Sequence, residues 1–413
     1  MKSPLPPPIS TSNSIRDRGL YSSAVIEGFR QFKHLELNEF ARVNLFFGPN
    51  NSGKTSILEA LYTHACGFNF ASILVSAVLN RPDRTISGAL DIGERLLSLF
   101  QNTSSLPYNF TISAKLTGDS STHTATSTFH PSPEISDLDP RILGSLSVNL
   151  PSYNQAVDTF LPAEISHYDS VLQSLNISQK GSRLFIGKWQ ININENHSEI
   201  DLYVPLSNLN ITIPFKKAVL HDILAHRELG AGVKIFSFLK RYGLLHKFTE
   251  EMKVVFPDIR EIDIIPYPDG TLAPVTIATT DGQRLPIYAF GDGMRRWFYL
   301  LGQMLVFQNA VHCIEEIDAT FHPAAQSDFT HLLVNYAEKF NNQLFLTSHS
   351  LEFADALFDS LYGENGVVAD STKDPVRVFT TKRSPDPQII EVWSFTGREA
   401  YESRHLYELE LRG

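Results

Sequence analysis

The sequence predicts an α/β fold whose central sheet is assembled from both ends of the chain. Three short apolar runs carry this prediction: Val43–Phe47, Val311–Ile314 and Gln343–Thr347. Each run is followed by polar or glycine-rich residues and then by apolar residues at helical spacing. Short apolar runs that alternate with helices are typical of buried parallel strands.

Composition narrows the class of protein. The 413 residues include 35 Lys+Arg and 45 Asp+Glu, which gives a net charge of −10, and 42% of the residues are hydrophobic. This mixture is that of a globular protein and excludes wholesale disorder. Two cysteines are too few for a disulfide scaffold or a cysteine-built zinc module. The acidic balance disfavours a protein that coats nucleic acid by bulk charge.

The first residues predict no export or membrane segment. Residues 1–20 are rich in Pro and Ser, and we expect a disordered tail there. No apolar region follows Lys2, and no run approaches the roughly 20 residues that a membrane helix needs. The expected location is therefore cytoplasmic, with no membrane partner.

A phosphate loop follows the first buried run. Residues 24–37 read as two short strands or one kinked strand, and Val43–Phe47 then leads into the sequence GPNNSGKT at 48–55. Glycines let successive backbone N–H groups point at phosphate oxygens, and the following helix adds positive potential. Lys54 would reach the β- and γ-phosphates, and the Thr55 hydroxyl would bind Mg²⁺. The predicted nucleotide contacts here are Gly48, Asn50, Asn51, Ser52, Gly53, Lys54, Thr55 and Ser56.

Paired carboxylates form the predicted second half of the site. Glu315 and Glu316 directly follow the run Val311–Ile314. In phosphate-loop enzymes the first such acid holds Mg²⁺ and the second polarises the attacking water. We assign Glu315 to the metal and Glu316 to the water. The run Gln343–Thr347 ends near His349, which the order of motifs suggests as a γ-phosphate contact.

A second glycine turn precedes a strongly apolar helix. Gly291-Asp-Gly293 opens a helical pattern that begins at Met294 and Arg295. Backbone donors at a helix N-terminus could contact phosphate. A tight turn before a core helix would explain the same residues equally well.

These motifs, in this order, resemble the ABC-type ATPase heads of the SMC, RecF and OLD (overcoming lysogenisation defect) group. The resemblance rests on IEGFRQF at 26–32, GPNNSGKTS at 48–56, FGDGMRR at 290–296, EEID at 315–318 with FHP at 321–323, and TSHS at 347–350. It covers residues 22–66 and 285–410. The closest variety is the stand-alone OLD-like AAA ATPase without a Toprim domain, several of which serve in anti-phage defence.

The resemblance implies ATP and Mg²⁺ as ligands and a homodimer or higher oligomer as the working form. Gly291, Gly293 and Arg295 would touch the ATP of a partner subunit, and Asp318 would lie near that interface. Glu316 would be the catalytic base and His349 the γ-phosphate sensor. ATP would join two heads, and hydrolysis would release them.

One residue departs from the family pattern. The Walker B metal ligand is usually Asp, and Glu315 places its carboxylate one methylene farther out. Because Mg²⁺ demands near-ideal geometry, we hypothesise that hydrolysis is slow and that ATP acts mainly as an assembly switch. Gln101 and Gln155 are equally weak candidates for the Q-loop glutamine.

The middle of the chain predicts insertions between the two halves. Residues 107–130, 183–193 and 199–215 alternate loosely and suggest an antiparallel β subdomain, whereas 262–289 reads as a three-strand meander. Residues 217–256 look helical and basic. The predicted organisation is therefore lobe I at 21–215, a helical insertion at 216–256 and lobe II at 257–413.

Two functions remain open at this point. The first is an ATP-driven switch or sensor subunit that controls a separate effector, a nuclease or Toprim-like protein, in anti-phage defence. The second is a RecF-like repair ATPase that binds DNA directly. The basic stretch 216–253 separates them, because one exposed basic patch would favour DNA and scattered or buried charges would favour a protein partner.

Overall fold

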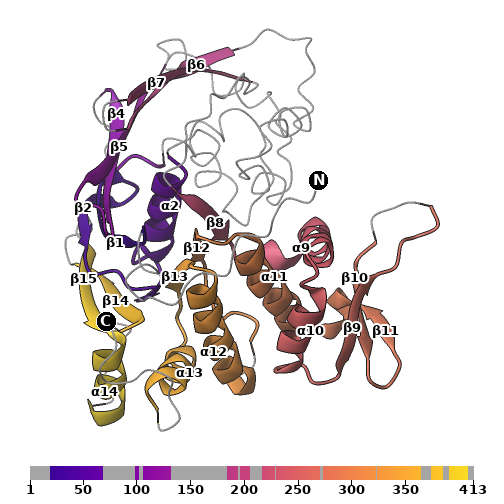
Figure 1. Cartoon of the computed structure of the whole chain (residues 1–413). Helices are drawn as coiled ribbons and strands as arrows, with labels where there is room; N and C mark the ends of the chain where they lie inside the picture. The colour runs from indigo at the N-terminus through magenta and orange to yellow at the C-terminus, as the bar shows by residue number, and fades with distance from the viewer. Residues whose placement is uncertain are drawn as a thin grey trace.

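The structure is a computed structural model (Figure 1). It describes residues 19–67, 98–101, 106–131, 184–193, 196–204, 216–227, 229–269, 273–321, 323–363, 374–384 and 390–407. The predicted tail up to residue 18 and the Q-loop candidate Gln155 lie outside these ranges.

A six-stranded central sheet joins the two ends of the chain. Its spatial order is β15 (Ile390–Thr396), β14 (Val376–Arg383), β3 (Val43–Phe47), β13 (Gln343–Thr347), β12 (Ala310–Ile314) and β8 (Lys217–His221). The strands from β14 to β8 are parallel to their neighbours, and β15 is antiparallel to β14. Every residue of β3, β12 and β13 is buried, which explains their continuous apolar sequences.

A second six-stranded sheet is antiparallel. Its order is β2 (Phe32–Leu37), β1 (Tyr21–Phe29), β4 (Tyr108–Leu116), β5 (Thr122–Pro131), β6 (Leu184–Ile193) and β7 (Asn196–Val204). Helix α2 (Lys54–Ala65) contacts strands of both six-stranded sheets, and eleven of its residues are buried. The fold is thus a mainly parallel α/β core, in which the phosphate-loop segment follows β3, with an antiparallel β subdomain beside it.

Several helices pack around α11 (Asp292–Val306). Helix α9 (Leu229–Arg241), helix α10 (Leu245–Lys253) and helix α12 (Pro323–Lys339) contact it. The expected meander is present as β9 (Ile259–Ile264), β10 (Val275–Thr279) and β11 (Arg284–Pro286), followed by the short 3-10 helix η4 (Ile287–Phe290). At Gly302 an added Cβ would lie 2.4 Å from Ile235 Cγ2, so α9 and α11 pack closely.

The helical insertion begins later than its sequence suggests. Residues 217–221 form β8 at the edge of the central sheet, a short 3-10 helix η3 (Ala225–Arg227) follows, and α9 begins at Leu229. Four consecutive residues of β8 are buried against β12, and this tertiary pairing outweighs the helical pattern of the surrounding sequence.

The remaining helices lie on the opposite side of the central sheet from α2. Helix α12 packs against α13 (Leu351–Tyr362), which contacts α14 (Gly397–Tyr407) (Figure 1). In the part of the chain that the structure describes, no helix is both long enough and apolar enough to cross a bilayer.

Candidate nucleotide-binding site

The phosphate loop leaves β3 in a conformation that requires its glycines. Gly48 has φ of 147° and Gly53 has φ of 92°, both in the region that side chains rarely adopt. A Cβ on Gly48 would lie 2.3 Å from the carbonyl oxygen of Thr381 on β14. The Ser52 hydroxyl lies 2.7 Å from the Thr381 hydroxyl, which also donates to the Phe47 carbonyl at 2.9 Å. The loop is therefore braced by a strand from the C-terminal end of the chain.

Lys54 lies within the curl of the loop. Its Nζ donates to the carbonyl oxygens of Gly48 at 2.6 Å and Pro49 at 2.8 Å. Burial lowers the pKa of Lys54 to about 8, although the negative charges of Glu316 and Asp318 oppose the shift. Carbonyl acceptors hold this ammonium group in the place where phosphate oxygens would be expected to meet it.

Glu315 and Thr55, the two predicted metal ligands, lie together. Glu315 follows β12 and is buried, and its carboxylate accepts a hydrogen bond from the Thr55 side chain at the start of α2. Burial, followed by repulsion from Glu59, raises the pKa of Glu315 to about 8. A carboxylate beside a hydroxyl is the hard-oxygen pair that suits Mg²⁺ when phosphate and water supply the other ligands.

Among the described residues, no group of three or more His, Cys, Asp or Glu side chains is arranged to hold a metal by itself. Phosphate-loop sites bind Mg²⁺ through protein side chains and the phosphates of the nucleotide together.

Glu316 is exposed, in contrast to its neighbour. It has φ of 42°, an uncommon value for a residue with a side chain. Its backbone N–H donates to the Thr347 hydroxyl at 2.9 Å, and the next N–H, of Ile317, donates to the Thr347 carbonyl at 2.9 Å. The end of β13 thus holds the turn that directs one acid inward and the other outward.

Arg296 is a residue of this site that sequence reasoning missed. It is 1% exposed, and its Nη2 donates to the carbonyl oxygens of Glu315 and Glu316, each at 2.7 Å. Burial lowers its pKa to about 10, and nearby carboxylates including Asp318 and Glu316 counter that effect. The sequence feature that could have identified Arg296 is its position between the core residues Met294 and Trp297 of an apolar helix, where a charged side chain is unusual.

Two further carboxylates near Glu315 were not predicted. Glu59, one turn along α2 from Thr55, is buried and its Oε2 accepts from Arg30 Nε at 2.8 Å. Asp222, just after β8, is also buried, and its charge raises the pKa of Glu315 as well. Both approach the site through tertiary structure, so their sequence positions gave no sign of a role.

His349 and the second glycine turn occupy different surroundings. His349 is half-buried two residues after β13, whose end lies beside the end of β3 through the pairing of Thr347 with Phe46. Gly291 is exposed with φ of 87°, and apart from its own chain neighbours no described atom lies within 4 Å of its Cβ position. A Cβ on Gly293 would lie 3.0 Å from the Thr320 carbonyl, so this turn adjoins the segment after the acidic pair.

Arg295, predicted to touch a partner's nucleotide, is engaged within its own chain. Its Nη2 donates to the Arg227 carbonyl at 2.7 Å and its Nη1 to Asp292 Oδ1 at 3.4 Å. Asp318 has a buried Oδ1 with no hydrogen-bond partner among the described residues. Gln101 lies beside β1, where its N–H donates to the Gly28 carbonyl at 2.8 Å.

Two family models match this chain. The family described as "AAA domain, putative AbiEii toxin, Type IV TA system" matches residues 191–355, and a family described as "AAA domain" matches residues 23–67. The second range contains the phosphate loop, and the first contains the acidic pair and His349.

Curated relatives share a short segment with the chain. It is 46% identical over 54 residues to the DNA replication and repair protein RecF of Nitrosococcus oceani, which is 13% of this chain and 15% of that protein. It is 45% identical over 58 residues to RecF of Shewanella baltica, which is 14% of this chain and 16% of that protein. The chain thus spans only about a sixth of the length of these relatives.

Solved structures similar to the chain include SMC heads. The SMC head domain from Thermotoga maritima aligns over 91% of this chain and 99% of its own, with 10% identity and a TM-score of 0.41. An Smc head domain bound to the C-terminal domain of ScpA, derived from Pyrococcus furiosus, aligns over 94% and 100%, with 11% identity and a TM-score of 0.46. In sequence, the chain is therefore similar to AAA domains over residues 23–67 and 191–355 and to RecF over one short segment.

Proposed function

We propose that this protein binds and hydrolyses ATP with Mg²⁺, dimerises around the nucleotide and acts as a switch for a separate effector. One observation carries the proposal. Thr55, Glu315 and Glu316 follow the ends of parallel strands of one sheet, together with His349. Carboxyl ends of parallel strands form the ligand-binding edge of an α/β sheet.

Each residue has a chemical task in this proposal. The loop amides, Lys54 and Ser56 bind the phosphates, and Thr55 with Glu315 binds Mg²⁺. Glu316 polarises the attacking water from its exposed position, and His349 contacts the γ-phosphate. Bound Mg²⁺ would neutralise charge that develops on the phosphate oxygens.

The dimer is supported by the surroundings of the second glycine turn. Gly291 is exposed, and nothing described lies close to it, so a phosphate of a second subunit could approach its backbone. We propose that the ATPase lobes are 21–215 and 257–413. The segment between them, 216–256, contributes β8 to the central sheet before its helical part begins at Leu229. A role in anti-phage defence would be in keeping with the matched family description, which includes a type IV TA system.

The distribution of basic residues favours a protein partner over DNA. Several cations of the stretch 216–253 are already occupied. Lys216 donates to the Gly19 carbonyl at 2.6 Å, Arg227 pairs with Asp292, Lys240 lies 3.7 Å from Asp263, and Lys253 lies 2.6 Å from Glu250. Basic side chains that are paired with acids and spread over different elements attract the phosphate backbone of DNA only weakly.

The test compares the wild type with Glu316→Gln in ATPase and size-exclusion measurements, with and without duplex DNA. We expect slow hydrolysis by the wild type and an ATP-dependent dimer that accumulates in Glu316→Gln, because the variant binds ATP but cannot activate water. A variant that stays monomeric with ATP would overturn the dimer switch. Strong stimulation of the wild type by DNA would instead favour the RecF-like function.

A further inference from the structure

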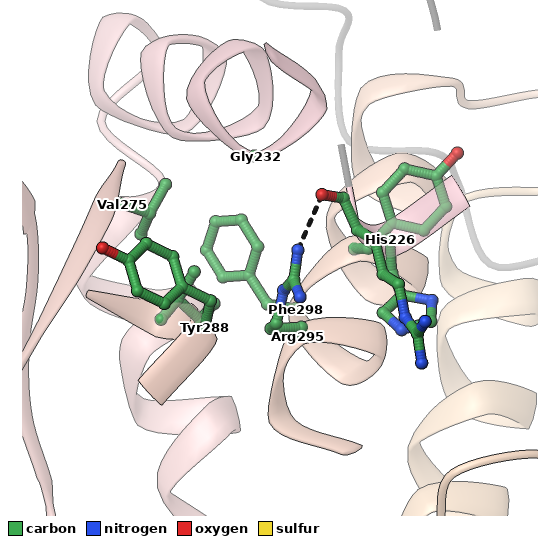
Figure 2. Close-up of a pocket in the computed structure, with 9 residues that line it drawn as sticks. His226, Gly232, Val275, Tyr288, Arg295 and Phe298 are labelled. Carbon is green, nitrogen blue, oxygen red and sulfur yellow. Dashed lines mark hydrogen bonds between the residues drawn. The ribbon is translucent and has the colours of Figure 1, made fainter. Parts of the chain in front are cut away.

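A second candidate binding site lies beside the start of α11, apart from the phosphate loop. It is a cavity of about 190 Å³ between η3, α9, β10, η4 and α11. Figure 2 shows Val275, Tyr288 and Phe298 around one part of it, and Arg295 and His226 around the other. Of the residues assigned to nucleotide binding, Arg295 lines this cavity, and the proposed ATPase chemistry does not account for the apolar space beside it.

The cavity has an apolar wall and is kept open by a glycine. Val275, Ile287 and Phe298 are each at least nine-tenths buried and line it. Gly232 of α9 also lines it, and a Cβ there would meet only Val275 Cγ2, at 3.5 Å, within 4 Å. Because glycine costs about 1 kcal/mol relative to alanine in a helix, its use at a position with room for a side chain suggests that the space is retained for another occupant.

The opposite wall carries net positive charge. Arg227 and Arg295 share one carboxylate, that of Asp292. The dashed line in Figure 2 marks the hydrogen bond from Arg295 to the Arg227 carbonyl, which fixes the two arginines relative to each other. Arg227 remains 51% exposed at its side chain. A second carboxylate, brought by a ligand, would balance the remaining charge.

A buried histidine adds an unsatisfied polar atom. His226 lines the cavity, its side chain is 1% exposed, and its Nε2 has no hydrogen-bond partner among the described residues. Asp292 Oδ1 lies 3.6 Å away, beyond hydrogen-bonding distance. A buried polar nitrogen normally has a hydrogen-bond partner, so the cavity is suited to a ligand that carries a polar group as well as an apolar one.

Exposed apolar side chains continue from the cavity onto the surface. Tyr288 lines the cavity and is 54% exposed, and Ile265 and Tyr267 are also exposed. Val275 pairs with Ile264 on β9, so Ile265 and Tyr267 follow directly from the end of the sheet that borders the cavity. Aromatic side chains around a pocket are typical of protein interfaces with one central anchor.

We propose that this cavity receives an aromatic side chain of a partner protein, with an aspartate or glutamate next to it in sequence that pairs with Arg227. The backbone of the partner's segment would lie across Tyr288 and supply the hydrogen-bonding group for His226. The proposal rests on the proposed function in one respect, the existence of a separate effector. Arg295 borders both the cavity and the second glycine turn. Binding of the partner's aromatic side chain would therefore be coupled to nucleotide-dependent assembly.

The test uses N-acetyl-Asp-Phe-amide as the probe and methyl NMR of the full chain without nucleotide. We expect the Ile287 methyl signal to shift on titration. Gly232→Leu, which fills the cavity, should abolish the shift, and Gly232→Ala should preserve the fold with weaker binding. Arg227→Glu should weaken binding at least about tenfold through loss of the charge-assisted pair, whereas the matched exposed control Arg241→Glu should not.

Three results would overturn the proposal. One is the absence of a shift in the wild type up to the solubility limit of the peptide. Another is binding of N-acetyl-Lys-Phe-amide with equal affinity, which would contradict pairing of an acidic residue with Arg227. The third is binding of AMP in place of the peptide, which would make this a small-molecule site. Because the peptide titration contains no nucleotide, it is independent of the proposed ATPase. Absence of ATP binding by the wild type, or unchanged ATP binding by Lys54→Ala, would overturn the ATPase and leave the peptide result standing.

Discussion

Arg296 fixes the backbone of Glu315, because its Nη2 donates a hydrogen bond of 2.7 Å to the Glu315 carbonyl oxygen. The same nitrogen donates to the Glu316 carbonyl, and Nη1 lies 3.4 Å from the Ile223 carbonyl. One buried guanidinium therefore connects α11, the segment after β8 and the turn that carries both acids. The orientation of the acidic pair depends on a helix that begins at the second glycine turn.

Arg296→Lys should lower kcat by about 10- to 100-fold, because a single ammonium cannot reproduce the planar fork and small misplacements of catalytic groups are costly. The KM for ATP should change little, since Lys54 and the phosphate loop are untouched. Steady-state kinetics measure this split. Arg404→Lys, which alters the pair with Asp355 on α13, is the matched control and should leave kcat unchanged.

Glu315→Asp should raise the ATPase rate by roughly tenfold, since a shorter carboxylate restores the usual distance to the metal. Glu316→Asp serves as the opposite control, because it moves the catalytic base away from the water and should lower the rate. Both rates are measured at saturating Mg²⁺ and ATP. If Glu315→Asp shows no gain, the geometry at Glu315 does not limit hydrolysis.

Mg²⁺ binding should strengthen as pH rises toward about 8. Burial raises the pKa of Glu315 to about 8, so the carboxyl group is protonated at lower pH and the proton must leave before Mg²⁺ can bind. The apparent affinity should rise by up to about tenfold per pH unit below that value. Calorimetric titration of Mg²⁺ into the ADP-bound protein at several pH values measures the slope. Glu315→Gln should remove it, and a slope that persists in this variant would assign the titration to another group.

Thr381→Val should weaken ATP binding and destabilise the fold by about 1–3 kcal/mol, because it leaves buried hydrogen-bonding groups of Phe47 and Ser52 unpaired. Nucleotide binding is measured with a fluorescent ATP analogue, and stability by denaturant unfolding. Thr381→Ser retains the hydroxyl and should restore most of the binding. A loss as large in Thr381→Ser as in Thr381→Val would contradict an effect of the hydroxyl alone, because serine keeps the hydroxyl and lacks only the methyl group.

The sequence predicted several local elements around the candidate site. The phosphate loop, the strands β3, β12 and β13, and the start of α11 each follow from residues that are adjacent in the chain. The backbone takes positive φ at positions 48 and 53, where glycine is favoured. Strands that are buried on both faces have continuous apolar sequences. Such requirements are met within a few residues, so they can be recognised from the sequence without knowledge of the fold.

The residues that contact the phosphate loop and the acidic pair from distant segments were decided by the tertiary structure. Thr381 reaches the phosphate loop because β14 pairs with β3, and Arg296 reaches Glu315 because α11 packs beneath the end of β12. The cavity beside α11 likewise needs α9, β10 and η4 to meet. The sequence by itself indicated the buried strands β3, β12 and β13, the helices that follow them and the glycine turns, whereas it gave β8 a helical reading. Only the tertiary structure decided their neighbours, because a hydrophobic pattern specifies that a face is buried but not which face it is buried against.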